Sequence, residues 1–324
     1  MASITKKKMH FSAVHKMMTV AGGLKKGLPW TVSLSLFFWV YHTTDLSGVE
    51  QTFATANYAV FVILLVGYIL TAWLLDALYL YLAYGWLTNT GEFVTLCRVR
   101  AASYLLAIIN MFVGMGGLVV FMKKRYGVPL QRGTGVVITE LLLEVGAFGL
   151  LALCAIMLTA TPHIPAIESV TMFGLGATGF FASCFLVSRI FRHFIHSRDR
   201  TKPLAAVADL RATQFFSLFL LKIIYNLFHG LFIGLALHSF SIYVPLDIST
   251  AFTQVIQLVR NLPVAAFGIG VDQISFTYLF SEWEQSSGQI LAFSMLYTTS
   301  TILTRALLGL VFAPGIIREF QKVD

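Results

Sequence analysis

The chain has 324 residues; 57% of them are apolar, only 12% are charged, and the formal net charge is +8. Soluble domains carry about 25% charged residues, so this composition excludes an ordinary water-soluble enzyme or binding domain. It predicts an all-α polytopic membrane protein. Basic residues collect on the cytoplasmic side of such proteins, so the positive charge does not indicate nucleic-acid binding.

Residues 1–27 form a basic lead that precedes the first long apolar run. Phe11, Val14, Met17 and Ala21 recur at roughly helical spacing among several lysines. The pattern predicts an amphipathic helix on the cytoplasmic face of the membrane, with a disordered basic arm as the alternative. No small-residue cleavage site follows cleanly, so we do not expect a cleaved signal peptide.

Six stretches after this lead are apolar enough to cross the membrane, which takes about 20 residues. We therefore expect six crossing helices. They are Leu28–Thr44, Tyr58–Trp86, Thr134–Thr159, Ile167–Ile190, Thr213–His238 and Gln289–Val311.

Two further apolar stretches are interrupted. Ala101–Met122 contains Asn110 and three closely spaced glycines, and Ile248–Phe280 contains an arginine, a proline, two glycines and an aspartate. If both stretches crossed the membrane, the basic cluster at 123–132 would lie outside, against the positive-inside rule. We therefore expect each stretch to enter the membrane and return to the side from which it came.

With two such re-entrant elements, 20 of the 23 Lys and Arg residues lie inside and none outside. The other three, Lys222, Arg260 and Arg305, lie within membrane segments. This distribution predicts a multi-pass protein of the cell inner or plasma membrane with both termini in the cytoplasm.

The two broken elements enter from opposite faces, and each is followed by a crossing helix. This order predicts an inverted repeat in which broken helices meet near the bilayer midplane. We divide the chain into four parts. They are the lead 1–27, a first membrane half 28–160 with its re-entrant element 101–122, a linking helix and basic cytoplasmic loop 161–211, and a second half 212–324 with its re-entrant element 248–280.

The second broken stretch carries Pro263, followed by Gly268, Gly270, Val271 and Asp272. This run resembles the Pro-…-Gly-x-Gly-Val-Glu element of the lysylphosphatidylglycerol synthase/flippase transmembrane-region family. Asp272 stands where the family has Glu. The helix that contains Arg305 follows at about the family's distance.

The first broken stretch is similar to another element of the same family. Asn110 is followed by Gly116 and Gly117, then by a basic cluster and Gly127-Val128. The element lacks the family's Pro. Glu140 stands where the family has a Glu-Arg pair at the start of the next helix, and Leu141 replaces the Arg of that pair. The resemblance covers about residues 28–315. It implies the lipid-translocating part of the family and not the aminoacyl-transfer activity of its soluble domain.

Ionisable groups at membrane depth cost about 2.5–3.5 kcal/mol each on insertion scales, so we treat them as functional candidates. The three cations would neutralise a lipid phosphate, and glycines would allow the backbone to approach it. The candidate substrate-binding residues are Arg260, Arg305, Lys222, Asp272, Glu140, Glu144, Asn110, Gly268 and Gly270. The alternative is that the charges pair with one another, as Arg260 with Asp272 or Arg305 with Glu140. Gly230 and Gly234 form a small-xxx-small pattern that is typical of helix packing.

The sequence favours a lipid flippase or transporter that moves an anionic or polyprenyl-phosphate-type lipid between leaflets. The alternative is a non-transporting membrane scaffold that docks a partner complex on the same fold. We expect no enzyme activity, cofactor or metal, because no catalytic or metal-ligand constellation stands out. The expected partners are anionic membrane lipids and either a second copy of the chain or another membrane subunit.

Overall fold

The computed structural model describes residues 49–108, 111–159, 165–195, 205–261, 269–283 and 288–321, with five single positions between 31 and 42. Within these residues every regular element is a helix, which confirms the all-α prediction. The basic lead and nearly all of the expected crossing Leu28–Thr44 lie outside the described residues, as do Asn110, Pro263 and Gly268.

Five long helices are apolar enough to cross a membrane among the described residues. They have 27 to 33 residues, about 40–50 Å at 1.5 Å per residue. Each begins within four residues of its predicted start, so five of the six predicted segments form helices of sufficient length and apolarity to cross. The helices are α3 (Tyr58–Thr88), α6 (Leu130–Leu158), α7 (Pro165–Ile195), α9 (Ala212–His238) and α12 (Gln289–Gln321).

The two interrupted stretches form pairs of shorter helices. The first pair is α4 (Phe93–Ala107) and α5 (Met111–Tyr126), and the second is α10 (Leu246–Asn261) and α11 (Val271–Phe280). These helices have 10 to 16 residues, or about 15–24 Å, less than the ~30 Å hydrocarbon core. The first pair is longer than the predicted 101–122. Arg100 of α4 pairs with Asp76 of α3 inside the bundle, so this charged residue does not end the helix.

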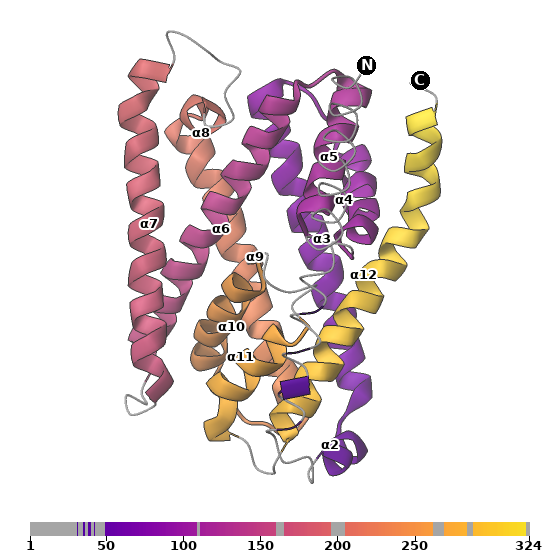
Figure 1. Ribbon diagram of the computed structural model, residues 1–324, viewed down its shortest axis with the longest axis vertical. Coiled ribbons are helices and arrows are strands. Elements are labelled where there is room, and N and C mark those ends of the chain that lie inside the picture. The colour runs from indigo at the N-terminus through magenta and orange to yellow at the C-terminus, as the bar shows by residue number, and fades with distance from the viewer. Residues whose placement is uncertain are drawn as a thin grey trace, which may run out of the picture.

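The two pairs lie at opposite ends of the molecule (Figure 1). The first lies in the upper half, beside the C-terminal end of α3, and the second lies in the lower half, beside the C-terminal end of α9. The short helices α2 (Val49–Thr55) and α8 (Ala205–Asp209) lie at the lower and upper ends respectively. A 3-10 turn, η1 (Ser281–Trp283), follows α11.

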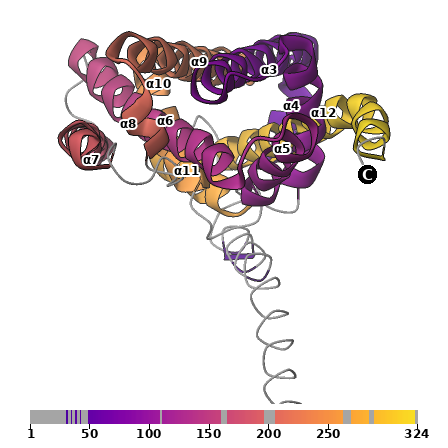
Figure 2. The same ribbon diagram turned by 90° about the horizontal axis from the view of Figure 1, so that it is seen from above.

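Seen from above, α3 and α9 lie side by side along one edge, and α7 lies at the outside of the bundle against α6 (Figure 2). The buried apolar residues form two clusters at different levels of the bundle. On α3 the lower cluster ends at Ala72 and the upper one begins at Tyr79. On α9 the upper cluster ends at Leu218 and the lower one begins at Tyr225. The level between the clusters on both helices is where ionisable side chains are buried.

Helices α9 and α10 approach closely at Gly230 and Gly234, which confirms the packing role predicted for this pair. A Cβ atom at Gly230 would lie 2.8 Å from the Cα of Thr250, and one at Gly234 would lie 2.5 Å from the Oγ of Ser249. Both distances are too short for a real side chain, so glycine permits the contact.

We predict that Gly230→Ala destabilises the protein by about 1–3 kcal/mol, because the added methyl collides with backbone and not with a flexible side chain. The matched control is Gly67→Ala on α3, where a Cβ atom meets nothing within 4 Å. The control should be neutral or slightly stabilising, since Ala favours helix over Gly. Thermal unfolding of the purified variants in detergent measures both changes, and equal unfolding temperatures would contradict the close approach.

Candidate functional site

Lys222 of α9 is buried between two carboxylates from other helices. Its Nζ lies 2.9 Å from Oε1 of Glu140 on α6 and 3.3 Å from Oδ1 of Asp76 on α3. The Lys222 side chain is only 2% exposed, and its Nζ also lies 4.7 Å from the ring centre of Tyr79. An ammonium at this depth is tolerable only because its charge is matched, so the cluster joins three helices through one cation.

Arg100 of α4 adds a second cation to the same cluster. Its Nη2 donates to Oδ2 of Asp76 at 2.7 Å and lies 3.7 Å from Oε1 of Glu140. The Arg100 side chain is 14% exposed. Two cations and two carboxylates from α3, α4, α6 and α9 therefore form one ion-pair cluster, which we call the upper charge cluster.

A second ion pair joins α10 to α11. Arg260 donates from Nε to Oδ1 of Asp272 at 2.9 Å and from Nη2 to the other carboxylate oxygen. Asp272 is fully buried, and its carboxylate also accepts a hydrogen bond from Thr298 of α12 at 2.9 Å. The bidentate geometry is the one in which the guanidinium fork matches a carboxylate best. Gly270, the N-cap residue directly before α11, has a positive φ of 84°, where a residue with a side chain would be strained.

Tyr297 of α12 extends this pair toward α9. Its hydroxyl accepts from Nη1 of Arg260 at 3.1 Å and lies 2.9 Å from Nε2 of His229. The imidazole of His229 stacks on Tyr68 of α3, with ring centres 4.7 Å apart. The Arg260–Asp272 pair is thus held by side chains from α9 and α12.

Between the two groups lies a cavity of about 100 Å³, lined by residues of seven helices. Three arginines reach its wall: Arg100, Arg260 and Arg305. Asp76 and Glu144 are its only acidic residues within the described part of the chain. Met111 and Gly114 of α5 also line it. Three guanidinium groups around one small space make an environment suited to a phosphate group.

Arg305 differs from the other two arginines. It makes no ion pair with any carboxylate of the described residues, and its guanidinium instead lies 5.5 Å from the ring centre of Tyr104. The alternative pairing of Arg305 with Glu140 is absent, because Lys222 and Arg100 contact Glu140 instead. The alternative pairing of Arg260 with Asp272 is present.

The structure brings together some of the residues predicted from sequence and separates others. Arg260, Arg305 and Glu144 line the cavity. Lys222, Glu140 and Asp272 lie behind its wall in ion pairs, and Asn110 and Gly268 fall outside the described residues.

Arg100 was missed as a site residue, because the charge count assigns it to a cytoplasmic loop. Its position directly before the apolar stretch that begins at Ala101 is the signal that could have identified it.

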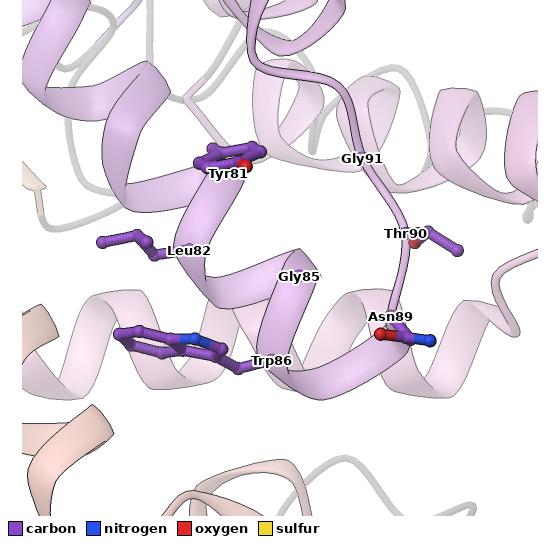
Figure 3. Close-up of a pocket in the computed structure, with 7 residues that line it drawn as sticks. All are labelled: Tyr81, Leu82, Gly85, Trp86, Asn89, Thr90 and Gly91. Atoms are coloured by element: carbon purple, nitrogen blue, oxygen red, sulfur yellow. The ribbon is translucent and has the colours of Figure 1, made fainter.

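A larger hollow of about 340 Å³ lies elsewhere, at the C-terminal end of α3. Figure 3 shows the segment from Asn89 to Gly91 running beside the last turns of this helix, with Tyr81 and Trp86 on the helix itself. Its lining includes no carboxylate, Lys, Arg or His. It therefore takes no part in the charged site.

We predict that Lys222→Met destabilises the fold by about 3–5 kcal/mol, because it leaves buried carboxylates without their cation. Lys123→Met, at an exposed position near the end of α5, is the control and should change stability little. The double variant Lys222→Met/Glu140→Gln should recover part of the loss, since it removes a cation and a carboxylate together. Chemical or thermal unfolding in detergent tests this, and an unchanged stability of Lys222→Met would contradict the buried cluster.

Comparison with protein families gives a match to one, described as the lysylphosphatidylglycerol synthase TM region, over residues 28–309. Neither the curated proteins nor the solved structures yield a match. The family match covers most of the chain, including both helix pairs and the whole cavity, and it confirms the resemblance seen in the sequence. It supports a membrane-lipid, transporter-like domain. The chain belongs to the lysylphosphatidylglycerol synthase transmembrane-region family.

Proposed function

We propose that this protein moves an anionic phospholipid or a polyprenyl-phosphate-type lipid between leaflets, with no covalent chemistry on the lipid. The observation that carries the proposal is the cavity wall with three arginines, of which Arg305 has no carboxylate partner among the described residues. A guanidinium left without an anion inside an apolar bundle is costly unless a ligand supplies one. A lipid phosphate is such a ligand.

The size of the cavity defines what enters it. A cavity of about 100 Å³ has room for a phosphate group and not for the acyl chains of a lipid. The headgroup phosphate would enter while the acyl chains stay in the bilayer. Gln257, also on the wall, has a side-chain oxygen with no hydrogen-bond partner, which a headgroup hydroxyl would satisfy.

The arrangement of the helix pairs supports the proposed topology. The helices of each pair are too short to cross. In each pair the chain enters and leaves at the same end of the bundle, and the two pairs lie at opposite ends (Figure 1). We take them as re-entrant elements of an inverted repeat with the cavity between them. The basic ends of α5, α7 and α12 lie at the upper end, which would be the cytoplasmic one.

A non-transporting scaffold is the second candidate. It is favoured by the closed ion pairs of Lys222 and Arg260, because of the three cations predicted at membrane depth only Arg305 lacks an ion pair with a described carboxylate. In this case the charges would hold the fold, and a second copy or another membrane subunit would bind the lipid-facing helices.

We predict that the purified protein accelerates leaflet exchange of a labelled anionic phospholipid in liposomes and that Arg305→Ala slows this exchange about tenfold to a hundredfold. The loss corresponds to one charge-assisted hydrogen-bond set of about 1.5–3 kcal/mol. Arg305→Lys should retain part of the activity, because it keeps the charge but not the planar fork.

The matched control is Arg318→Ala, an exposed arginine on the same helix, which should exchange lipid at the wild-type rate. Exchange no faster than in empty liposomes, for several lipid classes, would reject the flippase proposal and favour the scaffold. Equal rates for the Arg305→Ala and Arg318→Ala variants would reject this cavity as the site.

A further inference from the structure

The charges around the cavity divide into matched and unmatched groups. Arg100 and Lys222 are matched by Asp76 and Glu140 in the upper charge cluster. Arg260 is matched by Asp272. This leaves one cation, Arg305, and one further carboxylate, Glu144.

Glu144 lies one helical turn after Glu140 on the same face of α6, and its side chain reaches the cavity wall. The residue is 8% exposed. Unlike Glu140, it makes no ion pair or hydrogen bond with the described residues. Glu144 and Arg305 therefore share one cavity without direct contact.

This arrangement has a consequence for an anionic ligand. With every group ionised, the four cations and four carboxylates sum to zero. A phosphodiester bound at Arg305 adds one negative charge, and the ionised Glu144 on the same cavity wall would repel it. A proton on Glu144 restores neutrality and turns an acceptor oxygen into a hydroxyl donor toward the phosphate.

We infer that Glu144 is a proton-binding site that takes up one proton when an anionic lipid headgroup enters the cavity. The inference rests on the proposed function and adds a coupling ion to it. The proton comes from water, binds a Glu144 carboxylate oxygen, and returns to water when the headgroup leaves. Lipid binding and protonation then favour each other by the same factor.

Other charged and titratable groups face Glu144 and set its environment. Lys222 of α9 and Arg100 of α4 attract its charge, whereas Glu140 on α6 and Asp76 on α3 repel it. Arg260 of α10 and Arg305 of α12 stand on the same cavity wall. Tyr79 and Tyr225 lie within its electrostatic reach. None of the cations forms an ion pair with Glu144, so its proton can exchange without breaking one.

The test measures proton uptake directly. The full-length protein in detergent is titrated with a short-chain phosphatidylglycerol, whose phosphodiester keeps its charge across the physiological pH range. Calorimetry in buffers of different ionisation enthalpy gives the number of protons bound per lipid. We expect up to one proton per lipid, and a Kd that rises about tenfold per pH unit where Glu144 exchanges its proton.

Three variants isolate the group responsible. Glu144→Gln should bind the lipid with no proton uptake and with a Kd that does not change with pH. Glu144→Asp should restore the uptake. Glu168→Gln, the same chemical change at an exposed position on α7, should behave as the wild type. Circular dichroism and unfolding temperature confirm that each variant is folded.

The outcomes separate this inference from the function on which it rests. Lipid binding without proton uptake in the wild type, or unchanged uptake in the Glu144→Gln variant, overturns the inference and leaves the flippase proposal intact. No saturable binding at any pH overturns both. Equal affinity for the water-soluble headgroup glycerophosphoglycerol would show that the site binds a soluble phosphodiester, and it would overturn the lipid as the source of the anion.

Discussion

The ammonium of Lys222 lies between the carboxylates of Asp76 and Glu140, at a level of the bundle where apolar clusters begin above and below. Isolated charges at this depth would be very unfavourable, so each group fixes the position of the others. Arg100 ties a fourth helix into the same arrangement. The positions of α3, α4, α6 and α9, and therefore of the cavity wall they share, follow from this matching of charge.

The cavity has walls that are held by ion pairs, and it is lined by two charged side chains that have no ion-pair partner among the described residues. Ion pairs and the Tyr297 hydroxyl hold its walls, while Arg305 and Glu144 face it without hydrogen-bonded partners of opposite charge in the described residues. Preorganised cations of this kind bind an anion without first having to reorient. A site built in this way can bind a headgroup without contacting the acyl chains, so selectivity among lipids would depend on headgroup charge and size.

Local features of the fold were predictable from sequence, and long-range pairings were not. The length of the apolar stretches predicted the five long helices. The interruptions in two further stretches, together with the distribution of basic residues, indicated the two helix pairs. The Arg260–Asp272 pair, 12 residues apart, could be predicted, because both residues flank one break. The partner of Lys222 lies 146 residues away in Asp76, and no periodicity encodes that distance. Arg100 was assigned to a cytoplasmic loop for the same reason, because a count of charges contains no information about a carboxylate on another helix.

The continuity of α12 sets how the site can open. Tyr297, which holds Arg260, and Arg305, which faces the cavity, lie eight residues apart on this helix, or about 12 Å along its axis. Because both residues belong to one continuous helix, a rigid rotation of α12 would move the Tyr297 hydroxyl and the Arg305 guanidinium together. Pro314 interrupts the backbone hydrogen bonding further along, where bending leaves both contacts unchanged. Helix α12 packs against α4 of the first pair and α11 of the second, so one continuous helix contacts both helix pairs.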